Sequence, residues 1–157
     1  MLATLLCLGC GGRPSTPAPQ SINDTLAQFM AAVKAKDLQR MGQLWGSQRG
    51  SASSYMEAGR LKKLLGTIQV YWDHRGYRVI EGPLPAQPVN PTFQDVPAPD
   101  RLRDFRVELQ RATGCNQVIP ITLVRTDQGG WLVYDVHLES AGNPATRCQR
   151  EDAGTRR

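Results

Sequence analysis

Apolar residues in the first half of the chain recur at helical spacing. Ser21 and Asp24 have the chemistry of a helix start. The apolar positions that follow repeat every three or four residues: Leu26, Phe29, Met30 and Val33. Asp37 has the chemistry of a cap for a second, short helix, which Gly46 can end. A third helix is predicted over residues 56–71, and its apolar face consists of Leu61, Leu64, Leu65 and Ile68.

The second half of the chain has the composition of β-strands. The strands are predicted over residues 77–81, 104–112, 117–127 and 130–140. The last two are expected to form a hairpin, because Asp-Gln-Gly-Gly at 127–130 has turn chemistry. Pro120 predicts a bulge or an unpaired edge in its strand. Six of the 11 prolines fall within 82–102, which predicts a long connection or a proline-broken edge ribbon.

This order of elements predicts the fold class. Helices followed by strands indicate one α+β domain over residues 21–140, with the helices packed on one face of an antiparallel sheet. A chain of 157 residues is long enough for one such core. Residues 141–157 are polar and are interpreted as a C-terminal tail.

The first nine residues form an uncharged apolar run that ends in a small residue before Cys10. Leu5, Leu6, Leu8, Gly9 and Cys10 resemble the bacterial lipoprotein signal, in which such a run precedes the lipidated cysteine. The resemblance implies a signal peptide over residues 1–9, which we expect to be truncated because no basic segment precedes the run. It also implies lipidation of Cys10 and a domain tethered on the envelope side of a bacterial membrane. Residues 10–20 would be the anchor cysteine and a flexible linker, because they are rich in Gly, Pro, Ser and Thr.

The remaining cysteines fit an exported protein. If Cys7 leaves with the signal and Cys10 carries lipid, two of the four cysteines remain, Cys115 and Cys148. A disulfide between them is the simplest interpretation in an oxidising compartment, and two unpaired thiols are the alternative. We expect no metal site, because neither cysteine has a His or Cys partner at ligand spacing.

Charge and motifs narrow the function classes. The net charge of +5 is divided between Arg13, the tail at 147–157 and the body of the domain. A nucleic-acid-binding domain concentrates its basic residues on one face, so this distribution argues against nucleic acid as a partner. Neither a nucleophile elbow nor a phosphate-binding glycine loop is present, and we expect no cofactor.

Two short stretches resemble the nuclear transport factor 2-like superfamily, which includes ketosteroid isomerase and polyketide cyclases. Residues 29–41 read as a helix, an Asp break and a second helix, and residues 129–136 resemble the Gly-Trp-x-Val-x-Asp-Val ending of the last strand in many members. The resemblance implies a curved antiparallel sheet, closed by helices into a cone around an apolar pocket. This fold hosts isomerases, dehydratases, small-molecule binders and catalytically silent partner domains, so it does not settle the function.

Two groups of residues are candidates for a site. Strict alternation along 130–140 would place Asp135 and His137 on the same face as Trp131 and Val133, opposite a core-facing set of Leu132, Tyr134, Val136 and Leu138. Asp135 and His137 would then be candidates for a base and a proton donor if they line a pocket, or a solvated pair if they do not. Trp72, Tyr71 and Tyr77 are candidates for a ligand-binding rim, with ordinary core packing as the alternative.

The expected function is that of an envelope lipoprotein whose domain binds a small apolar ligand or a protein partner without catalysis. The alternative is a pocket enzyme, an isomerase or dehydratase, that uses general acid and base catalysis. A third possibility is a pure interaction domain in which side chains fill the cone. A closed cavity containing a carboxylate with a raised pKa would favour the enzyme, whereas an apolar pocket without titratable groups would favour binding.

Overall fold

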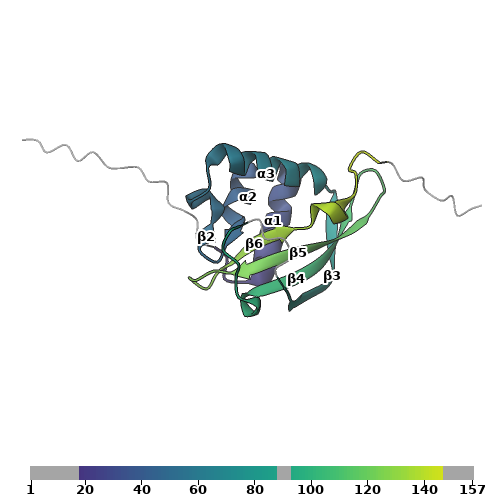
Figure 1. The fold of residues 1–157 in the computed structure, drawn as a ribbon. Helices are drawn as coiled ribbons and strands as arrows, with labels where there is room; N and C mark the ends of the chain where they lie inside the picture. The colour runs from purple at the N-terminus through teal and green to yellow at the C-terminus, as the bar shows by residue number, and fades with distance from the viewer. Residues whose placement is uncertain (1–17, 88–92, 147–157) are drawn as a thin grey trace, which may run out of the picture.

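The computed structural model describes residues 18–87 and 93–146, and these form an α+β domain. Its helical half comprises α1 (Ile22–Ala35), α2 (Leu38–Leu44), the short strands β1 (Gly46–Ser47) and β2 (Gly50–Ser51), the 3₁₀ turn η1 (Ala52–Ser54) and α3 (Ala58–Tyr71). The sheet follows, with β3 (Gly76–Pro85), η2 (Pro99–Arg101), β4 (Leu102–Gln110), β5 (Gln117–Arg125), β6 (Trp131–Val136) and η3 (Leu138–Ala141). The helices lie on one side of the sheet (Figure 1). The predicted α+β class is therefore confirmed.

The helix starts follow the capping chemistry of the sequence. The side chain of Ser21 accepts a hydrogen bond from the backbone N–H of Asp24, and that of Asp37 accepts one from Arg40, so both predicted caps are confirmed. The second helix ends at Leu44, before the predicted Gly46. Trp45 is extended instead, because it forms a parallel bridge with Val133 of β6.

The sheet has the order β3-β4-β5-β6, and each strand is antiparallel to its neighbour. β3 continues through Pro83 and Pro85, so the edge-ribbon interpretation holds for this part of the proline-rich segment. An edge strand tolerates proline because the missing N–H can face away from the sheet. Gly82 has a φ of +117°, and a Cβ atom there would lie 2.6 Å from the carbonyl O of Asp104.

Pro120 explains where β6 ends. β5 continues to pair with β4 through this residue, whose Cα partner is Arg106. The carbonyl of Pro120 accepts a 3.4 Å hydrogen bond from the N–H of His137, so the side of Pro120 that lacks an N–H faces β6. Pairing of β6 accordingly stops at Val136, and the strand predicted to reach residue 140 turns into η3.

A β-bulge changes which side chains of β6 lie on each face of the sheet. Thr122 pairs with Asp135 and Leu123 pairs with Val133, which leaves Tyr134 as the additional residue. The strict alternation expected along this strand is therefore wrong. Asp135 lies on the same face as Thr122 and not on the face of Val133, which is buried.

Aromatic and aliphatic side chains fill the space between the helices and the sheet. Phe29 of α1 contacts Trp45 and Trp72, with ring centroids 6.3 and 6.4 Å apart. From the sheet, β4 and β5 contribute the fully buried Val107 and Ile121. The helices are therefore held on the sheet by a large apolar core.

Candidate functional site

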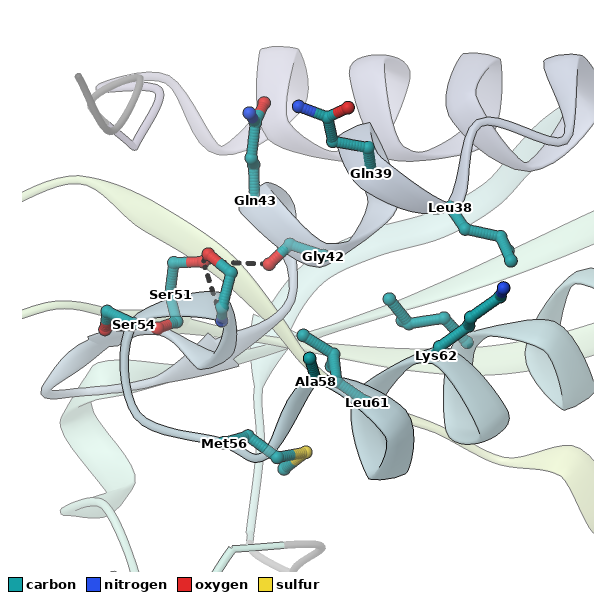
Figure 2. A pocket seen from close by; sticks show the side chains of 12 residues that line it. Leu38, Gln39, Gly42, Gln43, Ser51, Ser54, Met56, Ala58, Leu61 and Lys62 are labelled. Carbon is teal, nitrogen blue, oxygen red and sulfur yellow. Dashed lines mark hydrogen bonds between the residues drawn. The ribbon is translucent and has the colours of Figure 1, made fainter. Parts of the chain in front are cut away.

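A cavity of about 600 Å³ lies between α2 and the N-terminal half of α3, and we call it the α2–α3 cavity (Figure 2). Its lining residues are Leu38, Gln39, Gly42, Gln43, Ser51, Ser53, Ser54, Met56, Ala58, Leu61, Lys62 and Leu65. All of them come from α2, α3 and the segment between these helices, and none belongs to the four-stranded sheet. The cavity therefore differs in position from the cone interior implied by the superfamily resemblance.

Gly42 lines the cavity and lets α2 and α3 approach each other closely. It follows Leu38 by four residues, so the two share one face of α2. A Cβ atom at this position would lie 3.3 Å from Cδ1 of Leu65 and 3.5 Å from Cδ2 of Leu61. The glycine thus forms a notch in an otherwise apolar helix face, directly opposite two leucines of α3.

A network of serines holds the wall between the two helices. The hydroxyl of Ser51 donates to the carbonyl O of Gly42 at 2.8 Å, and the hydroxyl of Ser54 donates to the carbonyl O of Ser51 at 2.7 Å. The hydroxyls of Ser51 and Ser53 lie 2.7 Å apart. Figure 2 shows Ser51 directed at Gly42 across the end of the cavity. These bonds fix the segment before α3 against α2, so the wall is already formed without a ligand.

The floor of the cavity is apolar, and the charge of its lining is positive. Leu61 and Leu65 are buried, and Leu38 and Met56 are partly buried. Among the lining residues, Lys62 is the one with a charged side chain. The cavity lining therefore contains no carboxylate or imidazole that could act as a general acid or base near neutral pH.

The titratable residues cluster elsewhere, in a row across three strands of the sheet. We call Asp104, Thr122 and Asp135 the carboxylate row, because they occupy paired positions on β4, β5 and β6. The hydroxyl of Thr122 donates to Oδ1 of Asp104 at 2.6 Å. Burial raises the pKa of both carboxyl groups, since a low-dielectric environment disfavours their charged form.

His137 lies close enough to influence this row. Its positive form would lower the pKa of Asp104 and of Asp135, which partly opposes the effect of burial. Nδ1 of His137 lies 3.1 Å from Oε1 of Glu139, and that glutamate is exposed. The predicted pair of Asp135 and His137 is thus brought together, but neither residue lines the α2–α3 cavity.

The three aromatic candidates do not form a common rim. Trp72 is fully buried against Phe29, so core packing is the correct interpretation for it. Tyr77 is partly buried and packs edge-on against His74, with ring centroids 6.0 Å apart. Tyr71 lines a separate cavity of about 530 Å³ beside η3. None of the three lines the α2–α3 cavity.

Sequence patterns gave a partial signal for the cavity. Leu61 and Leu65 were identified as an apolar helix face, but that face was assigned to the core. The missed signal is Gly42, which interrupts the apolar face of a short helix four residues after Leu38. The serines of the lining gave no periodic pattern, because Ser51 belongs to β2 and Ser53 and Ser54 belong to η1. Met56, the predicted start of the third helix, lies in a bend before α3.

Cys115 is buried and disulfide-bonded. Its Sγ lies 3.3 Å from the carbonyl O of Thr146, two residues before Cys148 in the sequence. The predicted partner Cys148 lies outside the described residues, as do the predicted signal at 1–9 and the predicted anchor Cys10, so these assignments stay predictions.

Two further properties concern metals and membranes. Over residues 18–87 and 93–146, no three His, Cys, Asp or Glu side chains are grouped so that they could hold a metal ion. In the same ranges, no helix has the length and apolar composition needed to cross a bilayer.

Comparison of the chain with protein-family models, curated proteins and solved structures gave no significant match. The α2–α3 cavity and the carboxylate row are therefore the two observations from which a function can be argued.

Proposed function

We propose that this chain is a lipid-anchored protein of the bacterial envelope whose domain binds a small apolar ligand in the α2–α3 cavity, without catalysis. The observation that carries the proposal is the apolar floor of that cavity, formed by Leu38, Met56, Leu61 and Leu65. A volume of about 600 Å³ is in the range of small-molecule sites. A ligand that fills it would gain free energy by removing apolar surface from water.

Binding is favoured over catalysis because the chemistry and the cavity are separate. Acid and base catalysis requires a titratable group within hydrogen-bonding distance of the substrate. The carboxyl groups with raised pKa, Asp104 and Asp135, lie on the sheet, whereas the cavity is built from α2, α3 and the segment between them. The enzymatic alternative, with Asp135 as base and His137 as proton donor, would need a substrate site at the carboxylate row.

The fold assignment within the proposal is a nuclear transport factor 2-like cone. The order of the elements supports it, since three helices precede a four-stranded antiparallel sheet in the described part of the chain. The Gly-Trp-x-Val-x-Asp-Val stretch also falls on the last strand, β6 (Trp131–Val136). In this proposal side chains such as Phe29 and Trp72 fill the interior, and the ligand site lies between helices instead.

The envelope assignment is supported by the sequence before the domain and by Cys115. A linker rich in Gly, Pro and Ser after Cys10 suits a tethered domain. A disulfide at Cys115 suits an oxidising compartment. Mass spectrometry of the protein from a bacterial membrane fraction tests this, since a lipid adduct is expected on the wild type and not on Cys10→Ala. A wild type that retains an unmodified Met1 would contradict the assignment.

Binding of N-phenyl-1-naphthylamine, a neutral fluorescent probe, tests the site. The full chain is used with Cys10→Ala, so that no attached lipid competes. We expect saturable binding, weakened more than about twentyfold by Ala58→Trp, because an indole at the start of α3 would occupy the cavity.

Ala27→Trp is the matched control, since Ala27 is exposed on α1 and does not line the cavity. This variant should bind the probe as the parent does. Binding that is equally tight in the Ala58→Trp variant, with an unchanged fold by circular dichroism, would show that the probe sits elsewhere.

A further inference from the structure

We infer that the ligand of the α2–α3 cavity is a single-chain anionic amphiphile, whose hydrocarbon chain lies on the leucine and methionine floor and whose head group pairs with Lys62. This inference rests on the proposed function and adds the ligand class to it. It follows from which polar groups of the lining already have partners and which do not.

Most polar groups of the lining are already engaged. The hydroxyls of Ser51, Ser53 and Ser54 bond to one another or to backbone carbonyls. Oε1 of Gln43 accepts a 2.9 Å hydrogen bond from Nη1 of Arg40. The serine hydroxyl protons and the amide oxygen of Gln43 are therefore used within the wall, and the polar groups that remain on these residues are uncharged.

Lys62 differs from them. Its side chain is exposed, and among the described residues it has no ion-pair partner within 4.0 Å. In Figure 2 its ammonium end rises from α3 toward Leu38, at the end of the cavity away from Ser51 and Ser54. A chain lying on the apolar floor would therefore have its polar end within reach of this ammonium group.

Neighbouring basic residues on α3 add to the positive electrostatic potential around Lys62. Arg60 and Lys63 flank it on α3, and neither has an ion-pair partner in the described part of the chain. The acidic residue nearest in sequence is Glu57, whose carboxylate already accepts hydrogen bonds from the N–H groups of Gly59 and Arg60 at 2.7 Å. Three cations against one carboxylate over residues 57–63 give this end of α3 a net positive charge, which favours an anionic head group and disfavours a cationic one.

The size of the cavity sets the number of chains. About 600 Å³ is the volume of one small-molecule site, so we assign one chain. A free fatty acid and an anionic lysophospholipid share this chemistry, and they differ in whether the head is a carboxylate or a phosphate.

Competition against N-phenyl-1-naphthylamine tests the inference, with the full Cys10→Ala chain and four ligands of equal chain length below their micelle concentrations. The ligands are decanoate, decanol, decyltrimethylammonium and decanoyl-lysophosphatidylglycerol. We expect the two anions to compete best. Lys62→Gln should weaken them about threefold to tenfold and leave decanol unchanged. Lys63→Gln removes a neighbouring charge that does not line the cavity, so it should weaken the anions less and also leave decanol unchanged. The better of the two anions identifies the source.

The possible outcomes distinguish a failure of the ligand-class inference from a failure of the proposed function. If Lys62→Gln leaves decanoate and the lysophospholipid unaffected while decanol still competes, the head-group assignment is wrong and the apolar site remains. The same conclusion follows if decyltrimethylammonium competes better than either anion. If neither the probe nor decanol binds, the proposed function itself fails.

Discussion

A catalytic pocket combines a cavity with titratable side chains, whereas in this protein the α2–α3 cavity and the carboxylate row lie in different places. The cavity has volume, an apolar floor and one exposed lysine, but no carboxylate or imidazole among its lining residues. The carboxylate row has Asp104 and Asp135, whose pKa values are raised by burial, but these residues belong to the sheet and not to the cavity. A perturbed carboxylate is thus a structural consequence of burial here, and only its position relative to a cavity would make it a catalytic group.

The two regions also differ in the interactions that stabilise them. The cavity wall depends on hydrogen bonds between Ser51, Ser54 and nearby backbone carbonyls, whereas the row depends on strand pairing and on the bond from Thr122 to Asp104. Substitutions in the two regions should therefore have different signatures. Three substitutions test this difference, in order of decreasing effect.

Leu65→Ala should have the largest effect on stability. Leu65 is 1% exposed and reaches both the core and the cavity floor, so its truncation should cost about 2–4 kcal/mol in the free energy of unfolding. Urea unfolding followed by tryptophan fluorescence measures this. Leu64→Ala, at a partly exposed position, should cost less. Equal losses at the two positions would contradict the assignment of Leu65 as a shared floor residue.

Thr122→Val should have an intermediate effect, confined to the carboxylate row. The substitution removes the hydroxyl that donates to Asp104, and we expect a loss of about 1 kcal/mol at pH 7. Thr122→Ser, which retains the hydroxyl, is the matched control. Binding of N-phenyl-1-naphthylamine should be unchanged in both variants, and weakened binding in the Val variant would link the row to the cavity.

Asp135→Asn should have the smallest effect, and that effect should depend on pH. Burial raises the pKa of Asp135, against the opposing influence of His137, so the folded state retains the proton more readily than the unfolded chain. The stabilisation from the protonated carboxyl is complete below the ordinary carboxyl pKa and is lost as pH rises through the raised value. The Tm of Asp135→Asn relative to the wild type should therefore rise by up to a few degrees between pH 3.5 and pH 7.

Asp100→Asn is the control for this titration, because Asp100 is exposed. The Tm of this variant at each pH gives the effect of an Asp to Asn change at an exposed position. Burial also raises the pKa of Asp104, so the Tm of the double variant Asp104→Asn/Asp135→Asn relative to the wild type should rise further over the same pH range. A pH-independent difference for Asp135→Asn alone would show that this carboxyl group is solvated.

Much of the fold could be predicted because it depends on local chemistry. Ser21 and Asp37 cap their helices through their own side chains, which sequence spacing reveals. The strands were located, but their ends were not, because the end of β6 depends on Pro120 of the neighbouring strand. Asp135 lies opposite the core-facing Val136, as predicted, but Val133 was assigned to the wrong face for a similar reason, since one additional residue, Tyr134, reverses the alternation.

The sequence by itself determined the helix starts, the α+β order and the residue types available for chemistry, because periodicity, capping and charge are local properties. Only the tertiary structure decided which apolar residues surround a cavity and which form the core. Leu61 and Leu65 share one helix face, yet how closely that face approaches α2 depends on Gly42 in a different helix. The candidate site arises from that meeting of two helices, which no single stretch of sequence contains.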